Sequence, residues 1–325
     1  MPLPRLFRLT VLLALLPLFP LQNACADDPW HPEPPIQSAE HWVQNGENRI
    51  YVWEKFAGPP EHKRVVVLAH GSATAGRESF DLQVPGRPGI SLMDRLAREG
   101  FDVFALDVRG FGRSTHPSGH FRTTDASTDL DAVVDAVVKL RGRPKVELLA
   151  WSYGTQYAGM FVMAHPDKVD RYIAFAQMGI DSADIARRRQ NIDTYAGKAY
   201  VHITEAGWHT RFTSLTPAEV NYPEVVDAFA KAASQVELET PTSPQLDMVT
   251  LLPMLNPRLI TVPVMLIHGQ FDDVADTRQL LPFFDLLPNP NKRYVIIPDG
   301  GHMIMFQKGY QAFQDTVVAY LRQDF

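Results

Sequence analysis

Residues 146–154, with the sequence Val-Glu-Leu-Leu-Ala-Trp-Ser-Tyr-Gly, constrain the fold of this chain more than any other stretch. The first five form a short, mostly apolar run, which is typical of a buried parallel strand. A helical pattern follows over residues 156–163. A strand that turns directly into a helix around a central serine, here Ser152, predicts the geometry of a nucleophile elbow.

The neighbours of Ser152 fit such a turn. Because the turn strains the serine backbone, the residues two positions away on either side must be small, and these are Ala150 and Gly154. The turn would lift the Ser152 hydroxyl clear of the sheet, beside the helix N-terminus, where free N–H groups favour a developing oxyanion. The alternative is that Ser152 only caps the helix. An acid and a histidine at later strand ends would decide between the two.

The chain on both sides of this stretch alternates strands and helices. A large core is expected, since 45% of the residues are hydrophobic and 21% are charged. Strands are predicted near residues 41–44, 49–56, 64–69, 102–106, 171–176, 263–267 and 293–297. Helices are predicted over residues 90–99, 126–140 and 311–322. This order predicts an α/β fold with a doubly wound, mostly parallel sheet, whose sites lie at the carboxyl ends of the strands.

Five short motifs follow predicted strands. They are His70-Gly71, Asp107-x-Arg109-Gly110-x-Gly112-x-Ser114, Ala150-x-Ser152-x-Gly154, His268-Gly269-Gln270-Phe271-Asp272 and Gly300-Gly301-His302. In these motifs and their order the chain resembles the α/β-hydrolase fold superfamily, in particular its serine esterase and lipase branch with a helical cap. The resemblance implies a helical cap at residues 180–258, inserted between two core segments, 27–179 and 259–325.

The resemblance also implies three catalytic roles, with Ser152 as nucleophile, Asp272 as orienting acid and His302 as general base. The chemistry agrees, because a serine hydroxyl is a poor nucleophile until a histidine takes its proton. The histidine in turn needs a carboxylate to fix its tautomer and stabilise its cation. Asp273, which is adjacent to Asp272, is the rival acid.

Backbone N–H groups are expected to form the oxyanion hole, one from Tyr153 and one from the loop after Gly71. By family analogy the loop donor is Ser72, with Ala73 as the alternative. This loop lacks the His-Gly-Gly-Pro-Gly run of the proline iminopeptidases and the Gly-Pro-Gly loop of the carbon–carbon bond hydrolases. Serine at the elbow also differs from the aspartate of the haloalkane dehalogenases and epoxide hydrolases. These branches are therefore disfavoured.

Other polar residues are expected to have structural roles. His70 and Asp107 are predicted to order their own loops. His116 and His120 have the spacing of a metal-ligand pair, but a proline and a glycine between them break any helix. The sequence therefore predicts no metal site and no cofactor.

The predicted cap is rich in aromatic residues, most of which should form its own core. Trp208 and Phe212 are the candidates for lining a substrate pocket over Ser152, since ligand sites often form between such parts. Arg187, Arg188 and Arg189 are expected to form a solvated helix face. Carboxylate binding by one of these arginines is the alternative.

Residues 1–26 are predicted to be a cleavable secretory signal. Two arginines precede an apolar run over residues 9–21, and Ala24-Cys25-Ala26 fits an A-x-A cleavage site. The apolar run is too short for an ordinary membrane span, so no stable membrane insertion is expected after cleavage. A lipid on Cys25 and an uncleaved anchor are the alternatives. The mature protein is predicted to be periplasmic or secreted.

Together these features predict an exported serine hydrolase that cleaves small-molecule carboxylic esters. Amide or peptide hydrolysis and cofactor-free perhydrolysis are alternatives for the same residues, and a noncatalytic binding protein on a hydrolase fold is another. The chain has 31 basic and 37 acidic residues. This balance argues against a nucleic-acid partner, because the phosphate backbone demands a basic face.

Overall fold

The computed structural model describes residues 34–178, 182–275, 277 and 280–325. The predicted signal peptide and its cleavage site lie outside the described residues, as does residue 180, where the predicted cap begins. In the described ranges, no helix has both the length and the apolar character needed to cross a membrane.

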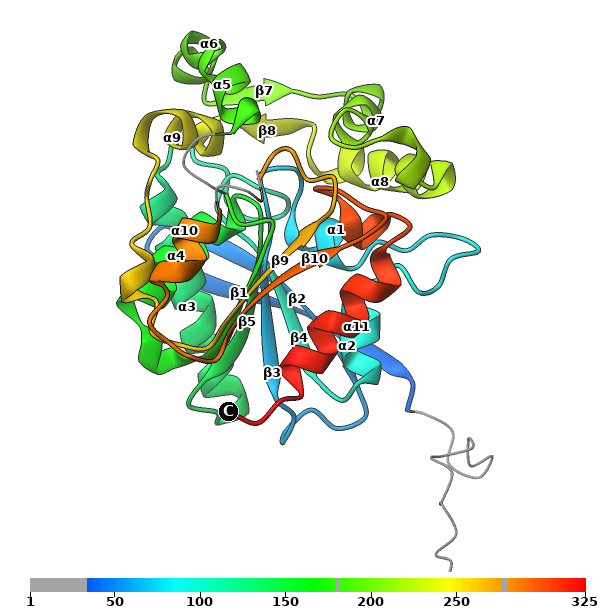
Figure 1. Ribbon diagram of the computed structural model, residues 1–325, viewed down its shortest axis with the longest axis vertical. Helices are drawn as coiled ribbons and strands as arrows, with labels where there is room; N and C mark the ends of the chain where they lie inside the picture. Colours follow the sequence, from blue (N-terminus) through cyan, green and yellow to red (C-terminus); the bar gives the residue numbers. More distant parts are fainter. Residues whose placement is uncertain (1–33, 179–181, 276, 278–279) are drawn as a thin grey trace, which may run out of the picture. The chain divides into compact units, whose positions relative to one another are not determined.

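An eight-stranded sheet lies at the centre of residues 34–325 (Figure 1). In spatial order its strands are β1 (Ile36–Asn45), β2 (Asn48–Ala57), β4 (Asp102–Asp107), β3 (Val65–Ala69), β5 (Val146–Trp151), β6 (Val169–Phe175), β9 (Val264–Gly269) and β10 (Lys292–Ile297). β1 and β2 form an antiparallel hairpin, and β2 is also antiparallel to β4. The strands from β4 to β10 run parallel to one another. The mostly parallel α/β sheet predicted from the sequence is therefore confirmed.

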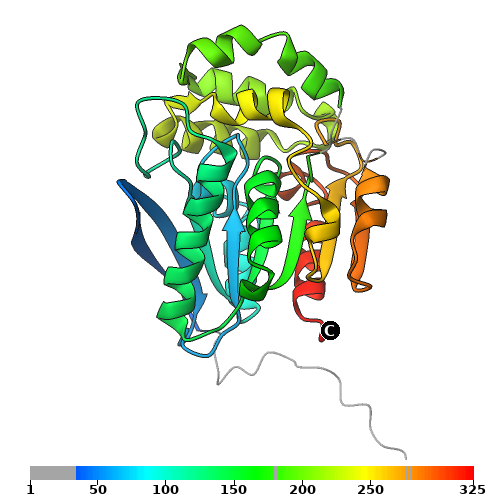
Figure 2. The ribbon, with the colours of Figure 1, turned by 90° about the vertical axis from the view of Figure 1, so that its left-hand side faces the viewer.

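Helices cover both faces of this sheet (Figures 1 and 2). α3 (Thr123–Arg141), α4 (Gly154–Ala164) and α10 (Leu280–Leu286) lie on one face, and α2 (Leu92–Arg98) and α11 (Tyr310–Leu321) lie on the other. β3, β4 and β5 are buried at every residue, as expected for strands packed on both faces. Gly142 is the C-cap residue that follows α3, and its φ of 62° is the left-handed conformation that favours glycine.

The segment between β6 and β9 lies over the carboxyl ends of the strands (Figure 2). It contains α5 (Ala183–Arg189), α6 (Ile192–Gly197), β7 (Tyr200–His202), α7 (Glu205–Thr213), α8 (Pro223–Val236), β8 (Glu239–Pro241) and α9 (Ser243–Leu251). β7 and β8 pair antiparallel, which the sequence patterns did not predict. The described ranges also contain short helices: α1 (Gly76–Phe80), η1 (Pro166–Lys168), η2 (Ala218–Val220), η3 (Pro257–Leu259) and η5 (Ile304–Phe306). Below, the segment from α5 to α9 is called the cap.

A buried glutamate joins the cap to the core. Glu237, which follows α8, accepts a hydrogen bond from the backbone N–H of Gly112 at 2.7 Å through one oxygen. Its other oxygen has no partner among the described residues. Burial raises the pKa of Glu237 well above its usual value, and the nearby carboxylates of Asp107 and Glu78 raise it further. The native state therefore favours the protonated, neutral form.

This contact predicts that Glu237→Gln stabilises the protein at alkaline pH. Because the native pKa of Glu237 is raised, the wild-type protein loses stability as the pH rises above the ordinary glutamate pKa. The neutral glutamine removes this loss. We therefore expect the free energy of unfolding of the variant to exceed that of the wild type by at least about 1 kcal/mol at pH 8, and the difference to shrink toward pH 5. Urea unfolding at both pH values measures it, with exposed Glu219→Gln as the control. A gain that is equal at both pH values would contradict this explanation.

Candidate active site

Ser152 lies in a sharp turn between β5 and α4. Its φ of 57° is in the left-handed region, which is rare for a residue other than glycine. Only glycine fits at position 154, because a Cβ atom there would lie 2.4 Å from the backbone oxygen of Ala69. The loop after β3 also packs against the turn, since a Cβ atom on Gly71 would lie 3.1 Å from the Ser152 Cβ. The strand, turn and helix therefore have the geometry predicted for residues 146–163.

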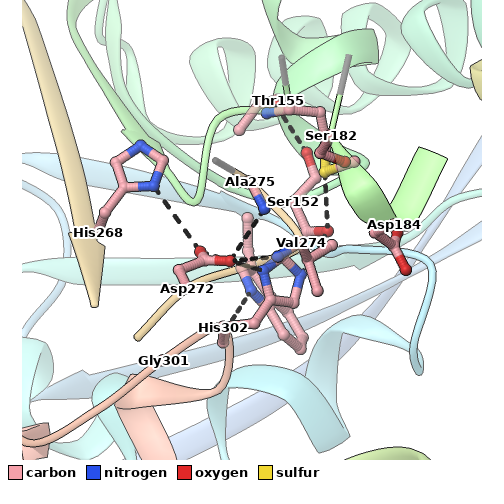
Figure 3. A network of polar contacts seen from close by, with 12 residues as sticks. Ser152, Thr155, Ser182, Asp184, His268, Asp272, Val274, Ala275, Gly301 and His302 are labelled. Atoms are coloured by element: carbon pink, nitrogen blue, oxygen red, sulfur yellow. Dashed lines mark hydrogen bonds and ion pairs between the residues drawn. The ribbon is translucent and has the colours of Figure 1, made fainter. Parts of the chain in front are cut away.

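Three residues predicted from separate strand ends meet at this turn (Figure 3). Ser152 Oγ lies 2.8 Å from His302 Nε2. On the other side of the ring, His302 Nδ1 lies 3.0 Å and 3.2 Å from the two carboxylate oxygens of Asp272. With its proton on Nδ1, donated to Asp272, the ring leaves Nε2 free to accept the hydroxyl proton of Ser152. All three side chains are buried.

Several hydrogen-bond donors hold the carboxylate of Asp272. Asp272 Oδ1 also accepts hydrogen bonds from the backbone N–H groups of Val274 at 3.1 Å and Ala275 at 2.9 Å. Burial alone would raise the pKa of Asp272, but His302 and His268 outweigh this and hold the pKa well below its usual range. Asp273 is exposed, one residue further along. The geometry thus favours Asp272 as the partner of His302.

His268 is a neighbour of this group that the sequence patterns did not single out. It is the second-last residue of β9, is completely buried, and places Nδ1 3.7 Å from Asp272 Oδ2 (Figure 3). The available signal was its position four residues before Asp272 in the same motif. A second residue missed from the sequence is Met178, whose sulfur lies 3.8 Å from Ser152 Oγ.

The two predicted oxyanion donors lie on either side of Ser152 in the fold. Tyr153 is the N-cap of α4, and Ser72 follows Gly71 in the loop after β3. Within the described ranges, the backbone N–H groups of Tyr153 and Ser72 donate to no protein acceptor. Both are therefore available to an oxyanion, next to the positive end of the α4 dipole.

The loops around the serine are ordered by buried side chains, as expected for His70 and Asp107. His70 Nε2 accepts from the backbone N–H of Val108 at 3.1 Å, so Nδ1 carries the proton and donates to the Gly71 oxygen at 2.7 Å. Burial lowers the pKa of His70 to about 4, which keeps the ring neutral. Asp107 accepts from the backbone N–H groups of Gly76 and Arg113.

The two histidines weighed as a metal pair have other partners. His116 Nδ1 lies 2.8 Å from the backbone oxygen of Ser114, and His120 Nε2 lies 2.7 Å from that of Tyr195. Among the described residues, no three His, Cys, Asp or Glu side chains gather as metal ligands would.

Trp208 and Phe212 lie in the apolar core of the cap, which differs from their expected place in a pocket wall. Both are completely buried. The two rings pack against Phe229, and Phe212 also packs against Phe306 of η5. Trp208 Nε1 donates to the backbone oxygen of Glu237 at 3.2 Å. Aromatic rings on one face of α7 bury more apolar surface against α8 and the core than they would in a pocket wall.

Trp208→Ala should therefore lower stability and leave substrate preference unchanged. Loss of a buried tryptophan typically costs about 3–5 kcal/mol. Melting temperature and the ratios of kcat/KM across esters of several chain lengths measure the two effects. Trp42→Ala, which removes a partly exposed ring from β1, serves as the control. A changed chain-length preference without loss of stability would instead place Trp208 in contact with substrate.

An apolar cavity of about 180 Å³ lies behind Met178. Leu252, Met254 and Leu255 line it from the chain that follows the cap, and Phe283 lines it from α10. Because Met178 also contacts Ser152 Oγ, this cavity adjoins the serine. Its size suits a short acyl or aryl group.

Comparison with known proteins gives one family match and many similar folds. A family model described as serine aminopeptidase, S33, matches residues 60–309. No curated protein sequence matches the chain. Among solved structures, an esterase from Thermogutta terrifontis has a TM-score of 0.64 at 19% identity, covering 88% of this chain and 98% of its own. An esterase from Exiguobacterium antarcticum has a TM-score of 0.66 at 18% identity, and the match covers 87% of this chain and 99% of that protein.

An enol-lactonase from Burkholderia xenovorans LB400 is similar to the same degree. Its TM-score is 0.66 at 18% identity, and the match covers 87% of this chain and 100% of that protein. At these identities the solved structures establish likeness of fold, and the family model adds a match in sequence over most of the chain.

Proposed function

The chain belongs to the serine aminopeptidase S33 family of α/β hydrolases, and from this premise we propose that it is an exported serine hydrolase that cleaves carboxylic esters. The observation that carries the proposal is the hydrogen-bonded series from Ser152 Oγ through His302 to Asp272. It joins a hydroxyl, a base and an orienting acid in the order that acyl transfer needs.

In the proposed mechanism Ser152 Oγ attacks the acyl carbon while His302 Nε2 takes its proton. The N–H groups of Tyr153 and Ser72 hold the oxyanion of the tetrahedral intermediate. The protonated Nε2 then gives its proton to the departing alcohol oxygen, which leaves an acyl group on Ser152. Water, deprotonated by the same nitrogen, attacks the acyl carbon and releases the acid.

A fluorophosphonate probe tests the proposal directly, because it labels serine hydroxyls that a histidine activates. We expect labelling at Ser152, found by peptide mass spectrometry, together with hydrolysis of 4-nitrophenyl butyrate. Loss of labelling in His302→Ala would tie the reactivity to the histidine. An unlabelled Ser152 in the folded protein would favour the alternative of a noncatalytic binding protein.

Amide cleavage is the second candidate, because the matching family model is described as an aminopeptidase. Either an ester or an amide can acylate Ser152, and for an amide the leaving amine must receive a proton from His302. Comparing kcat/KM for aminoacyl-4-nitroanilides with that for 4-nitrophenyl esters decides between the two. A preference for the anilides after allowance for intrinsic reactivity would favour the aminopeptidase.

Export is part of the proposal and gives its own prediction. Cleavage after Ala26 should yield a mature protein that begins at Asp27, because Ala24-Cys25-Ala26 fits a signal-peptidase site. N-terminal sequencing of protein recovered from the periplasm or medium of a bacterial host measures this. Recovery from the cytoplasm with residues 1–26 attached, or a lipid on Cys25, would contradict it.

A further inference from the structure

A second cavity, of about 320 Å³, lies within the cap, and several charged and polar side chains line it. Its walls come from α5, α6, β7, α7, β8 and α9, so it is formed almost entirely by the inserted segment. The residues that give it chemical character are Asp184, Arg188, Arg211, Thr240 and Gln245. Below it is called the cap cavity.

Arg211 supplies an unneutralised positive charge to the cap cavity. Its guanidinium donates to the backbone oxygen of Ser72 at 2.8 Å and lies 5.2 Å from the Trp208 ring. In the described part of the chain, no carboxylate lies within ion-pair distance of it. Burial lowers the pKa of Arg211 to about 10, and repulsion from Arg188 contributes. A half-buried cation of this kind is stabilised by any anion that enters the cavity.

The other charges of the cap cavity are already paired. Asp184 accepts from Arg188 at 2.5 Å and from Arg187 at 3.1 Å. One carboxylate is thus shared by two arginines, and the cavity keeps a net positive charge.

Two buried polar side chains of the cavity also have unused hydrogen-bonding capacity. The hydroxyl of Thr240 and the amide oxygen of Gln245 have no partner among the described residues. Buried polar groups without partners are rare and often mark a ligand. The Thr240 hydroxyl can donate a hydrogen bond, and the Gln245 amide can present its NH₂ group in place of its oxygen after a 180° flip of the amide plane. Both can therefore complete the coordination of an anion held by Arg211.

The cap cavity adjoins the candidate active site through its walls. Arg211 holds Ser72, the predicted oxyanion donor, and Gly71 next to it packs against Ser152. On the other wall, Asp184 interacts electrostatically with His302 and lies beside the Ser152–His302 pair (Figure 3). The cap cavity therefore neighbours Ser152, where the scissile bond of a substrate would lie.

We propose that the cap cavity binds a free carboxylate of the substrate through Arg211, so that the enzyme prefers esters that carry a negative charge away from the scissile bond. The inference rests on the proposed ester hydrolysis and adds the substrate class. Arg211 acts as a specificity residue, because it contacts a part of the substrate that does not react.

Two pairs of esters test this, each differing only in one charge. The first pair is mono-4-nitrophenyl adipate and its methyl-capped diester, with the charge on the acyl side. The second is 4-acetoxybenzoate and its methyl ester, with the charge on the alcohol side. For at least one pair we expect Arg211→Gln to lower kcat/KM of the anionic member about 10- to 100-fold more than that of the neutral member, because a loss common to both members comes from the Ser72 contact.

Two further variants give the comparison its controls. Arg211→Lys keeps the charge and should retain part of the preference. Arg258→Gln removes an equal charge from an exposed position and should change neither member of a pair. If Arg211→Gln slows both members of each pair equally, Arg211 only supports the Ser72 loop and the proposal is wrong. Unchanged rates for all four esters would also overturn it.

A binding experiment separates this inference from the proposed function. Calorimetric titration of the wild-type protein with adipate should give binding that is lost in Arg211→Gln, whether or not any ester is hydrolysed. Binding without hydrolysis of any ester would refute the proposed function and support the anion site. Hydrolysis of neutral esters without adipate binding would refute the anion site alone. Adipate binding with no preference for either anionic ester would overturn the assignment to substrate.

Discussion

Replacing Ser152 or His302 with alanine is expected to lower kcat/KM for an aryl ester by about 10⁴-fold or more. Ser152 Oγ lies 2.8 Å from His302 Nε2, so either replacement breaks the proton transfer that makes the hydroxyl nucleophilic. Because the two residues act as a unit, the double variant should be hardly slower than the slower single variant. Steady-state rates with 4-nitrophenyl butyrate measure all three variants.

Matched replacements elsewhere show whether the loss is specific. Ser234→Ala makes the same chemical change at a half-buried position of α8, and His62→Ala does so at an exposed position; both should keep the wild-type rate. Melting temperatures establish that every variant is folded. A folded Ser152→Ala variant that retained most of the activity would show that another residue is the nucleophile.

The strand ends could be predicted from the sequence because they combine two local signals. Ser152, Asp272 and His302 each follow an apolar run with the length of a strand, in a short motif containing glycine. Parallel strands bring their carboxyl ends to one edge of a sheet, so residues far apart in the chain were expected to meet there. The structure brings His302 within hydrogen-bonding distance of both Ser152 and Asp272.

The cap could not be predicted in the same detail, because its contacts are not local. An aromatic residue in a cap core has the same sequence signal as one in a pocket wall, and only packing against Phe229 distinguishes Trp208. The proposed role of Arg211 depends on a backbone oxygen 139 residues earlier and on the lack of a carboxylate within ion-pair distance among the residues that the structure describes. His268 likewise becomes informative only through its distance from Asp272.

Asp272→Asn is expected to lower kcat/KM by up to about 10⁴-fold, while Asp273→Asn should leave it near the wild-type value. The carboxylate of Asp272 accepts from His302 Nδ1 and from two backbone N–H groups. Asparagine at that position replaces one acceptor oxygen with an NH₂ donor, which favours the wrong tautomer of His302. Asp273 receives the same chemical change one residue further along, at an exposed position, and is therefore a matched control.

Stability must be followed in the same experiment, because Asp272 also contributes to folding. The native surroundings hold its pKa below the usual range, so its contribution is present above the ordinary aspartate pKa and is lost as the pH falls through the native pKa. Asp272→Asn should accordingly melt lower at pH 7, with a gap that narrows in acid. Rates should be compared at pH 7 and at an assay temperature well below the melting temperatures of both variants. If Asp273→Asn lowers kcat/KM strongly and Asp272→Asn lowers it only slightly, the orienting acid is Asp273, despite its exposure.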